Sequence, residues 1–319
     1  MRAAQADFES AKAQFENATS NEKRRRTLFE QGNLSAEMFE AAAQARQAAE
    51  ASLQRVRTAL EKAQEQKIDR ICQRLNLQPG DRVLEIGTGW GGFAAWAASR
   101  YGCEVTTTTI SAEQHRHARE VFARLGEAGS RIHLLLEDYR RLTGQFDKIV
   151  SIEMFEAVGL NHYDDYFSAV DRLLTPSGTM LLQTITVDDQ WFPYYIKHPD
   201  WIEKYIFPGG QLASVGEIMK SVARTTSMSV YHAENIGTHY ARTLHAWRER
   251  FHRRLADVRS LGFDDRFIRM WDLYLGYCEA AFAERHAGDF QIMLAKNATD
   301  AVLFNEPWAQ NEPAAFAVA

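Results

Sequence analysis

The chain has 319 residues, of which 45% are hydrophobic and 25% are charged, as in an ordinary folded protein. Its net charge of -5 excludes a dedicated nucleic-acid binder, which would carry a basic surface. No apolar run approaches the roughly 18 residues that a membrane span needs, and the polar N-terminus does not resemble a signal peptide. The 3 widely spaced cysteines predict neither a disulfide framework nor a zinc site, so we expect a protein of the reducing cytosol.

Residues 1–66 differ from the rest, because they are rich in Ala, Gln, Glu, Lys and Arg and contain no proline. Apolar side chains recur three and four positions apart on both sides of a turn sequence, which predicts two helices packed on each other. Gly32 is expected to end the first helix and Ser35 to cap the second. The phrase Leu28-Phe29-Glu30-Gln31-Gly32-Asn33-Leu34-Ser35 resembles the coiled-coil hairpin of HlyD-type membrane-fusion adaptor proteins in architecture. A hairpin of this kind can also pair with a second copy, so a homo-oligomer is one expectation.

A buried strand and a glycine-rich turn are predicted at Val83-Leu84-Glu85-Ile86-Gly87-Thr88-Gly89-Trp90-Gly91-Gly92, and a helix follows. Glycines allow positive φ and let a ligand approach the backbone closely. Such a turn usually lies at the carboxyl edge of a parallel sheet and offers amides to a ligand's polar groups. The turn alone does not distinguish a dinucleotide site from other ligand sites.

Strands and helices alternate downstream, which predicts a parallel sheet covered on both faces. Ser111 is expected to cap the helix after the second strand. The late run 288–294 fits an antiparallel edge hairpin. Besides the strand at 83–86, strands are expected at 104–109, 131–136, 146–152, 179–186, 229–235 and 289–295.

Six motifs in a fixed order carry a resemblance to a known family. They are the glycine-rich turn, Thr109-Ile110-Ser111-Ala112-Glu113-Gln114, Glu137-Asp138-Tyr139, Glu153-Met154-Phe155-Glu156-Ala157-Val158-Gly159, Tyr205-Ile206-Phe207-Pro208-Gly209-Gly210 and His239-Tyr240-Ala241-Arg242-Thr243-Leu244-His245-Ala246-Trp247. Together they resemble the cyclopropane-fatty-acyl-phospholipid synthase and mycolic-acid cyclopropane synthase family, over roughly residues 62–300.

The resemblance implies an α/β fold: a Rossmann-like, seven-stranded class I methyltransferase that uses S-adenosylmethionine (SAM), with an N-terminal α-helical hairpin. We expect a hairpin at 1–66, a catalytic domain at 67–305 and a C-terminal tail at 306–319.

The resemblance also implies where SAM binds. The glycine-rich turn frames its methionine and ribose through Glu85, Gly87, Gly89, Trp90 and Gly91. The next two strand ends hold the ribose and the adenine through Thr109, Ser111, Gln114, Glu137 and Asp138. The residue types agree with these roles, because hydroxyl and amide groups can hydrogen-bond a diol and a carboxylate can accept from the adenine amine. For Ser111, an ordinary helix N-cap is an equally good interpretation.

The family's reaction implies the rest of the site. Methyl transfer to the cis double bond of an unsaturated phospholipid acyl chain leaves a carbocation, which must then lose a proton away from water. The family uses bound bicarbonate as the base, and the resemblance places around it Glu156, Tyr240, the backbone near Ile152, and Cys278. Gln183 stands where characterised relatives have a bicarbonate-binding histidine. Tyr240 as an ordinary aromatic and Cys278 as a small buried residue stay open as alternatives.

Two further groups have two interpretations each, and a pair of histidines has one. A dense aromatic group fits either a core lining or an acyl-chain channel: Trp191, Phe192, Tyr194, Tyr195, Trp201 and Tyr205. A basic helix fits either a contact with anionic lipid heads or a solvated face: Trp247, Arg248, Arg250, Phe251, Arg253 and Arg254. His115 and His117 lack a third ligand, so no metal site is expected.

We therefore expect a cytoplasmic C-methyltransferase that docks on the membrane surface without spanning it. One alternative is a methyltransferase of another small molecule, because fold alone does not define the acceptor. Another is a catalytically impaired fold that binds partners through its hairpin. In its favour, residues 1–66 contain no counterpart of the family's Tyr-Ser pair that covers SAM, nor of its cysteine at the bicarbonate site.

Overall fold

The computed structural model describes residues 2–299, except for the side chains of residues 2–10 and 56–64. The chain forms two compact units. The first comprises the chain up to Lys67 together with Arg242–Glu279, and the second comprises Ile68–Ala241 together with the described residues from Ala280 onward. The predicted tail at 306–319 and the end of the predicted catalytic domain lie outside the described residues.

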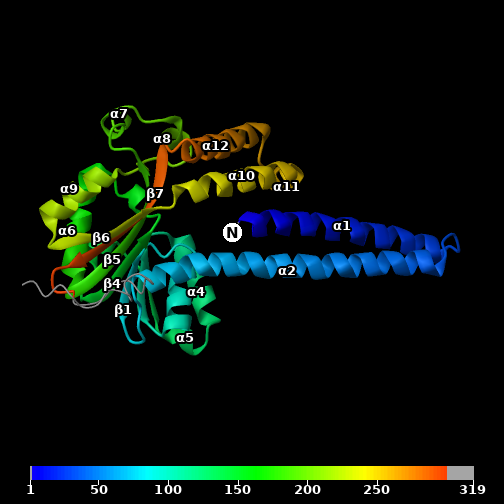
Figure 1. The fold of residues 1–319 in the computed structure, drawn as a ribbon, viewed down its shortest axis with the longest axis horizontal. Coiled ribbons are helices and arrows are strands. Elements are labelled where there is room, and N and C mark those ends of the chain that lie inside the picture. Colours follow the sequence, from blue (N-terminus) through cyan, green and yellow to red (C-terminus); the bar gives the residue numbers. More distant parts are fainter. Residues whose placement is uncertain (1, 300–319) are drawn as a thin grey trace, which may run out of the picture. The chain divides into compact units, whose positions relative to one another are not determined.

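The predicted hairpin is formed by α1 (Arg2–Glu30) and α2 (Ala36–Arg74), shown in blue in Figure 1. Gly32 has φ 75° in the turn, and the amide of Met38 donates to Ser35 Oγ at 3.3 Å. Both predicted caps are therefore confirmed. Helix α2 runs without a break through residue 66, so the predicted domain boundary falls inside a helix.

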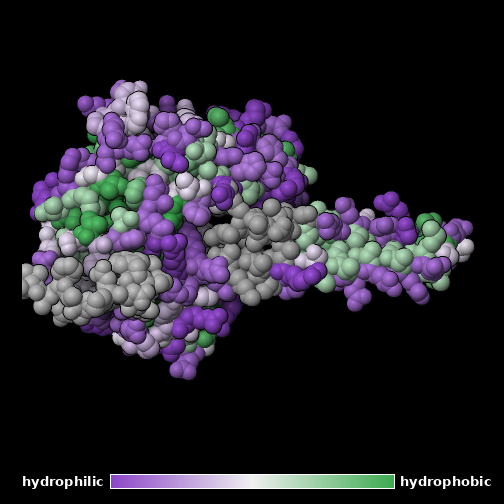
Figure 2. Space-filling view, in the orientation of Figure 1, coloured by the Kyte–Doolittle hydropathy of each residue, from purple (hydrophilic) through white to green (hydrophobic). Residues whose placement is uncertain are grey.

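Contacts between α1 and α2 hold the hairpin together. Arg46 Nε lies 2.7 Å from Glu22 Oε2 in a salt bridge that joins the helices. Phe29 stacks on Phe39 with ring centroids 5.3 Å apart. The outward surfaces carry many charged side chains, purple in Figure 2. These contacts join the two helices into an amphipathic pair.

Seven strands among the described residues form one sheet in the order β3-β2-β1-β4-β5-β7-β6. Strands β1 to β5 pair in parallel, whereas β7 is antiparallel to both β5 and β6. Each predicted strand is confirmed, with ends that differ by a few residues. Their bounds are β1 (Arg82–Ile86), β2 (Glu104–Thr109), β3 (Ile132–Leu136), β4 (Phe146–Ile152), β5 (Leu174–Val187), β6 (Met228–Asn235) and β7 (Ala287–Lys296).

The late run is antiparallel to its neighbours, as expected, but the expectation that it lies in a hairpin at the edge of the sheet is wrong. β7 lies inside the sheet between β5 and β6, so β6 is the edge strand, and helices separate the two in the sequence. The consecutive residues Ile292, Met293 and Leu294 are all buried. A strand that is covered on both faces has such a continuous apolar run, whereas an edge strand with a solvated face alternates.

The two faces of the sheet support two separate cores. On one face, Leu84 packs in a cluster with Phe167 of α6 (Tyr163–Leu173) and Ile218 of α9 (Val215–Thr225). On the other, Val83 packs in a cluster with Phe122 of α4 (Ala112–Ala123) and Ile71 near the end of α2. Because side chains alternate along a strand, neighbouring residues enter opposite cores. This arrangement confirms the predicted α/β class with helices on both faces.

Four of the remaining described helices are short, and three others, α10, α11 and α12, follow one another between residues 237 and 283. Among the described helices, we find none that combines the length and the apolar character needed to cross a membrane. Their bounds are α3 (Gly92–Trp96), α5 (Glu127–Ser130), α7 (Phe192–Tyr195), α8 (Trp201–Tyr205), α10 (Gly237–Arg253), α11 (Leu255–Ser260) and α12 (Asp265–Ala283).

The strand order reverses direction between β1 and β4, because the chain first builds outward to β3 and then returns to add β4 beside β1. In open α/β sheets, ligands bind at such a switch point, outside the carboxyl ends of the strands. The segments that leave these ends here are the glycine-rich turn after β1 and Glu153–Gly159 after β4.

Candidate active site

The three glycines of the turn after β1 have different roles. Gly87 has φ 100°, and a Cβ there would lie 2.9 Å from Met154 Cγ in the segment after β4. Gly91 has φ 87°, and a Cβ there would lie 2.9 Å from Phe122 of α4, so it serves helix packing. Gly89 has φ 52° and no neighbour within 4 Å of a Cβ, which leaves its backbone open to a ligand.

Glu85 is buried at the end of β1. Its Oε2 lies 2.6 Å from Thr107 Oγ1, which is also 2.8 Å from Thr88 Oγ1. A hydroxyl has one hydrogen to donate, so Thr107 donates to the carboxylate and accepts from Thr88. Burial raises the pKa of Glu85 to about 8, against the lowering effect of the Thr107 hydrogen bond.

The end of β2 and the start of α4 form a local polar cluster. Ser111 Oγ accepts from the amide of Gln114 at 3.2 Å, which confirms the predicted N-cap. Thr109 Oγ1 donates to Gln114 Oε1 at 2.8 Å and accepts from the amide of Ser111 at 3.1 Å. These three side chains hold one another in place, as a site that binds a diol requires.

The two acids after β3 are in different situations. Asp138 caps the turn at 139–141 and pairs with Arg140, whose guanidinium holds the pKa of that carboxyl below its usual range. The backbone carbonyl of Glu137 accepts from Thr108 Oγ1 at 2.5 Å, and Glu137 is exposed. Of the two, Glu137 is therefore better placed to accept from an adenine amine.

Three large apolar side chains are exposed around these strand ends. Trp90 is 64% exposed, Ile110 81% and Leu136 53%. Thr109, next to Ile110, pairs with Leu136 across the β2–β3 ladder, so these two lie at the same edge. Flat apolar surfaces of this kind suit an aromatic base. Ile110 and Leu136 were not singled out from the sequence, although an apolar residue directly after a strand end is a usable indication.

Glu156 is held in the segment after β4. Its Oε1 accepts from the amide of Ile185 at 2.6 Å and lies 3.1 Å from Thr184 Oγ1. Its Oε2 is buried with no hydrogen-bond partner among the described residues. Burial raises the pKa of this carboxyl. Ile152, whose backbone the resemblance places near the bicarbonate, pairs with Gln183 in the β4–β5 ladder, and its role at the site stays a prediction.

Gln183 is the centre of a buried network. Its Nε2 donates to Glu153 Oε1 and to Asp289 Oδ2, both at 2.8 Å, and its Oε1 accepts from Gln291 at 2.9 Å. Gln183 is 0% exposed, so its amide has no direct contact with solvent. Glu153 and Asp289 were not predicted as site residues, because they reach Gln183 from the ends of different strands.

Tyr240 lies in α10 and donates to Glu153 Oε1. Its ring packs against Phe282 at 5.3 Å between centroids. Burial, with the charges of Glu153 and Asp289, raises the pKa of this phenol, so it remains a donor. The structure therefore brings together Tyr240, Gln183 and Glu153 at the carboxyl end of β4.

The family described as mycolic acid cyclopropane synthetase matches residues 19–292. The chain belongs to this family. The match begins inside α1, well before the motifs that carry the resemblance in the sequence.

Two curated relatives support the assignment to this family of SAM-dependent methyltransferases. A tuberculostearic acid methyltransferase of Mycobacterium tuberculosis is 42% identical over 239 residues, covering 75% of this chain and 56% of that protein. A cyclopropane-fatty-acyl-phospholipid synthase of Escherichia coli is 43% identical over 237 residues, covering 74% of this chain and 59% of that protein. The chain thus spans little more than half the length of these relatives.

Solved structures agree on the fold. The mycolic acid cyclopropane synthase CmaA1 complexed with SAH and CTAB has a TM-score of 0.68 at 29% identity, covering 74% of this chain and 85% of that one. The cyclopropane synthase MmaA2 of Mycobacterium tuberculosis has a TM-score of 0.67 at 30% identity. The fold is that of a class I SAM-dependent methyltransferase, with a seven-stranded mixed sheet and the helical pair α1 and α2.

The residues around Gln183 do not fit the bicarbonate that the family resemblance implies. Both Gln183 amide hydrogens and the Tyr240 hydroxyl are already used on carboxylates of the chain. The Ile185 amide is used on Glu156. A bound bicarbonate would lack free hydrogen-bond donors at these groups, because they already donate to carboxylates. It would also be repelled by these carboxylates, which carry the same negative charge.

Cys278 belongs to a different part of the chain from these residues. It lies in α12, in the first unit, whereas Gln183 and Tyr240 lie in the second. Its role at the site stays a prediction.

Two of the four arginines predicted to form a basic face pair closely with carboxylates of the first unit. Arg248 of α10 pairs with Asp272 of α12 at 2.7 Å, and Arg254, directly after α10, pairs with Asp257 of α11 at 2.6 Å. Charges that are paired in this way attract anionic head groups less strongly. The solvated-face interpretation of this helix is therefore favoured.

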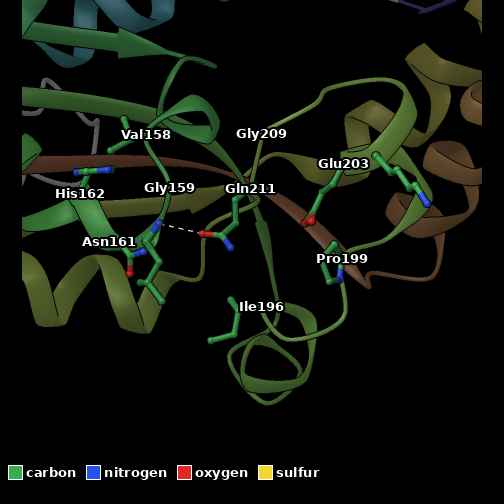
Figure 3. A pocket seen from close by; sticks show the side chains of 12 residues that line it. Val158, Gly159, Asn161, His162, Ile196, Pro199, Glu203, Gly209 and Gln211 are labelled. Carbon is green, nitrogen blue, oxygen red and sulfur yellow. Dashed lines mark hydrogen bonds between the residues drawn. The ribbon is translucent and has the colours of Figure 1, made fainter.

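The aromatic segment around α7 and α8 is mostly not core. Phe192 is buried, whereas Trp191, Tyr194 and Tyr205 are exposed. Beside it lies an open cavity of ≈ 870 Å³, shown in Figure 3, between the segment after β4 and the loops around α7 and α8. Gln211 lines this cavity and also contacts Glu156. Its backbone amide donates to the backbone carbonyl of Glu156 at 2.8 Å, and its side-chain Oε1 accepts from the backbone amide of Leu160.

Proposed function

We propose that this protein transfers a methyl group from SAM to the cis double bond of unsaturated acyl chains in phospholipids. The main observation in support is that the Gly87 turn, where we expect the cofactor, lies against Met154. Met154 belongs to the segment after β4 that carries Glu153 and Glu156. Support also comes from the relatives, whose names describe lipid methyltransferases and a phospholipid synthase.

The chain's own residues fit SAM. When bound, SAM supplies an electrophilic methyl group. Gly89 lets the ligand approach the backbone, and the Thr109–Gln114 cluster presents polar groups to the ribose. Trp90 and Ile110 provide apolar surface for the adenine, while Glu137 accepts from its amine.

The carboxylates provide what the acceptor chemistry needs. Methylation of an alkene leaves positive charge on the acyl chain, and a fixed negative group that faces this charge lowers its energy. Glu156 is fixed by the Ile185 amide and keeps Oε2 without a partner among the described residues. Either a ring or a methylene branch then requires the loss of one proton from the carbocation.

The cavity of ≈ 870 Å³ is the proposed entry for the substrate. Its volume suits a drug-sized or lipid ligand, and its wall includes Val158, Leu160 and Ile196 beside the polar Lys204 and Glu203. Such a mixture suits an acyl chain below a phospholipid head group. The exposed Trp191 and Tyr194 nearby are the surface that we propose meets the membrane.

Incubation with labelled SAM and vesicles of unsaturated phospholipid tests the proposal. Mass spectrometry of the released fatty acids should show one added carbon, and vesicles of saturated phospholipid should remain unlabelled. Turnover of a polar nucleophile such as an amine, with none on unsaturated lipid, would instead support a methyltransferase of another small molecule.

A further inference from the structure

The backbone of Glu153 is in a conformation that a non-glycine residue adopts at a cost. Asn76, Glu153 and Arg285 are the non-glycine residues with positive φ among the described residues. Asn76 and Arg285 follow the ends of α2 and α12, where a left-handed residue is common. Glu153, with φ 51°, follows a strand instead. Such conformations are strained and cluster at functional sites.

The contacts of Glu153 show what this conformation achieves. Its amide donates to the Gln183 carbonyl at 2.8 Å, and the Gln183 side chain donates back to Glu153 Oε1 at 2.8 Å. Tyr240 donates to the same oxygen. The next residue, Met154, packs against Gly87 of the cofactor turn. The carboxylate is thereby fixed by Gln183 and Tyr240, and the next residue in the chain contacts the cofactor turn.

The Glu153 carboxylate therefore lies where the resemblance expects a bicarbonate. Tyr240 and Gln183, the two side-chain donors assigned to that anion, both donate to Glu153. Asp289 and Glu156 add further carboxylates in the same region. Like charges repel one another more strongly in a buried site than in water, so a free anion there is disfavoured.

We propose that the carboxylate of Glu153, in place of bicarbonate, is the catalytic base of this protein. The inference rests on the proposed function. After methyl transfer, a C–H bond of the new methyl group breaks and its electron pair closes the third C–C bond of a ring. The proton passes to a carboxylate oxygen of Glu153 and from there to solvent. Tyr240 and Gln183 act as positioning residues that aim this carboxylate.

Turnover with and without bicarbonate tests the proposal. The parent protein should turn over unsaturated phospholipid equally well in carbon dioxide-free buffer and with added bicarbonate. Glu153→Gly should lower turnover by at least about a hundredfold, the usual contribution of a general base. Added bicarbonate should restore part of the variant's activity, because the missing side chain leaves Tyr240 and Gln183 as its donors.

Glu153→Gln is the matched variant. Its amide keeps the size of the side chain and accepts from Tyr240, but it takes up no proton. It should be inactive and should not respond to bicarbonate. Glu127→Gln, at a carboxylate whose side chain is 92% exposed, should behave as the parent. Glycine accepts φ 51° without strain, which offsets part of the cost of the hydrogen bonds that Gln183 and Tyr240 lose, so Glu153→Gly should still unfold cooperatively.

A binding measurement tests the role of Glu153 independently of whether the protein methylates lipid. Bicarbonate alone, titrated with ¹³C NMR detection into the SAM-loaded proteins, should bind Glu153→Gly and not the parent. Binding by the parent, or a parent that needs bicarbonate for turnover, would overturn the proposal. If the parent binds SAM but methylates no lipid, the proposed function fails, while the bicarbonate titration still decides whether Glu153 occupies the anion position.

Discussion

The backbone amide of Ile185 donates to the Glu156 carboxylate at 2.6 Å. A main-chain group of β5 thus fixes a side chain that follows β4, and it leaves Oε2 buried without a partner among the described residues. A carboxylate with one oxygen fixed and the other without a partner can stabilise a positive charge that develops only during the reaction.

Glu156→Gln tests this role. The glutamine carbonyl can still accept from Ile185, so we expect SAM affinity and thermal unfolding close to those of the parent. Turnover on unsaturated phospholipid should fall by at least about a hundredfold, as when one fixed electrostatic group is lost. Glu120→Gln, at an exposed carboxylate of α4, is the control. Parent-like turnover of Glu156→Gln would assign the residue a structural role.

A pair of glycine substitutions separates backbone strain from cofactor binding. Gly89 has φ 52° and Gly126 has φ 59°, and a Cβ at either has no neighbour within 4 Å. Alanine should therefore cost about 1 kcal/mol of folding stability at both positions. Calorimetric titration should show SAM affinity at least about tenfold lower for Gly89→Ala alone, a difference of about 1.4 kcal/mol. Equal affinities in the two variants would remove Gly89 from the cofactor site.

The burial of Glu85 predicts a pH dependence of stability. Its pKa is raised to about 8, so the folded protein keeps this proton in a range where the unfolded chain has lost it. Stability from this group is full below pH 4.5 and is lost as the pH rises through about 8. In the absence of SAM, urea unfolding of the parent should therefore weaken between about pH 5.5 and about pH 7.5 by about 1.4 kcal/mol per pH unit relative to Glu85→Gln. A parallel pH dependence of the two proteins would contradict the shifted pKa.

Local sequence patterns predicted the strands, the Gly87 turn and the Ser111 cap, because each depends on residues close together in the chain. The network of Gln183 could not be predicted in this way. Glu153 and Asp289 meet Gln183 only because β5 lies between β4 and β7 in the sheet. Sequence alone indicated a substitution of histidine by glutamine, whereas the fold shows that Gln183 holds two carboxylates.

The position of β7 illustrates the same limit. Its apolar run was visible in the sequence. The pairing of β7 with β5 could not be predicted, because three helices separate β6 from β7 in the chain and the sequence does not show which strands become neighbours. The main-chain amide that reaches Glu156 could not be predicted either. It belongs to Ile185, and its position depends on where β5 ends relative to the segment after β4.

Deletion of residues 1–60 tests the independence of the hairpin. The contacts that hold α1 to α2, such as Glu22 with Arg46 and Phe29 with Phe39, are made within the hairpin itself. The residues proposed to bind SAM all lie in the second unit. We therefore expect the truncated protein to bind SAM within about threefold of the full chain, a difference of about 0.65 kcal/mol.

Calorimetric titration of both proteins with SAM provides the measurement, and thermal unfolding shows whether the truncated chain is folded. An electrophilic methyl donor beside a carbocation needs a site closed to water. If the hairpin supplied that closure, its removal would weaken SAM binding by orders of magnitude in a protein that still unfolds cooperatively. Retained affinity would instead mean that another part of the protein covers SAM and that the hairpin is not needed for cofactor binding.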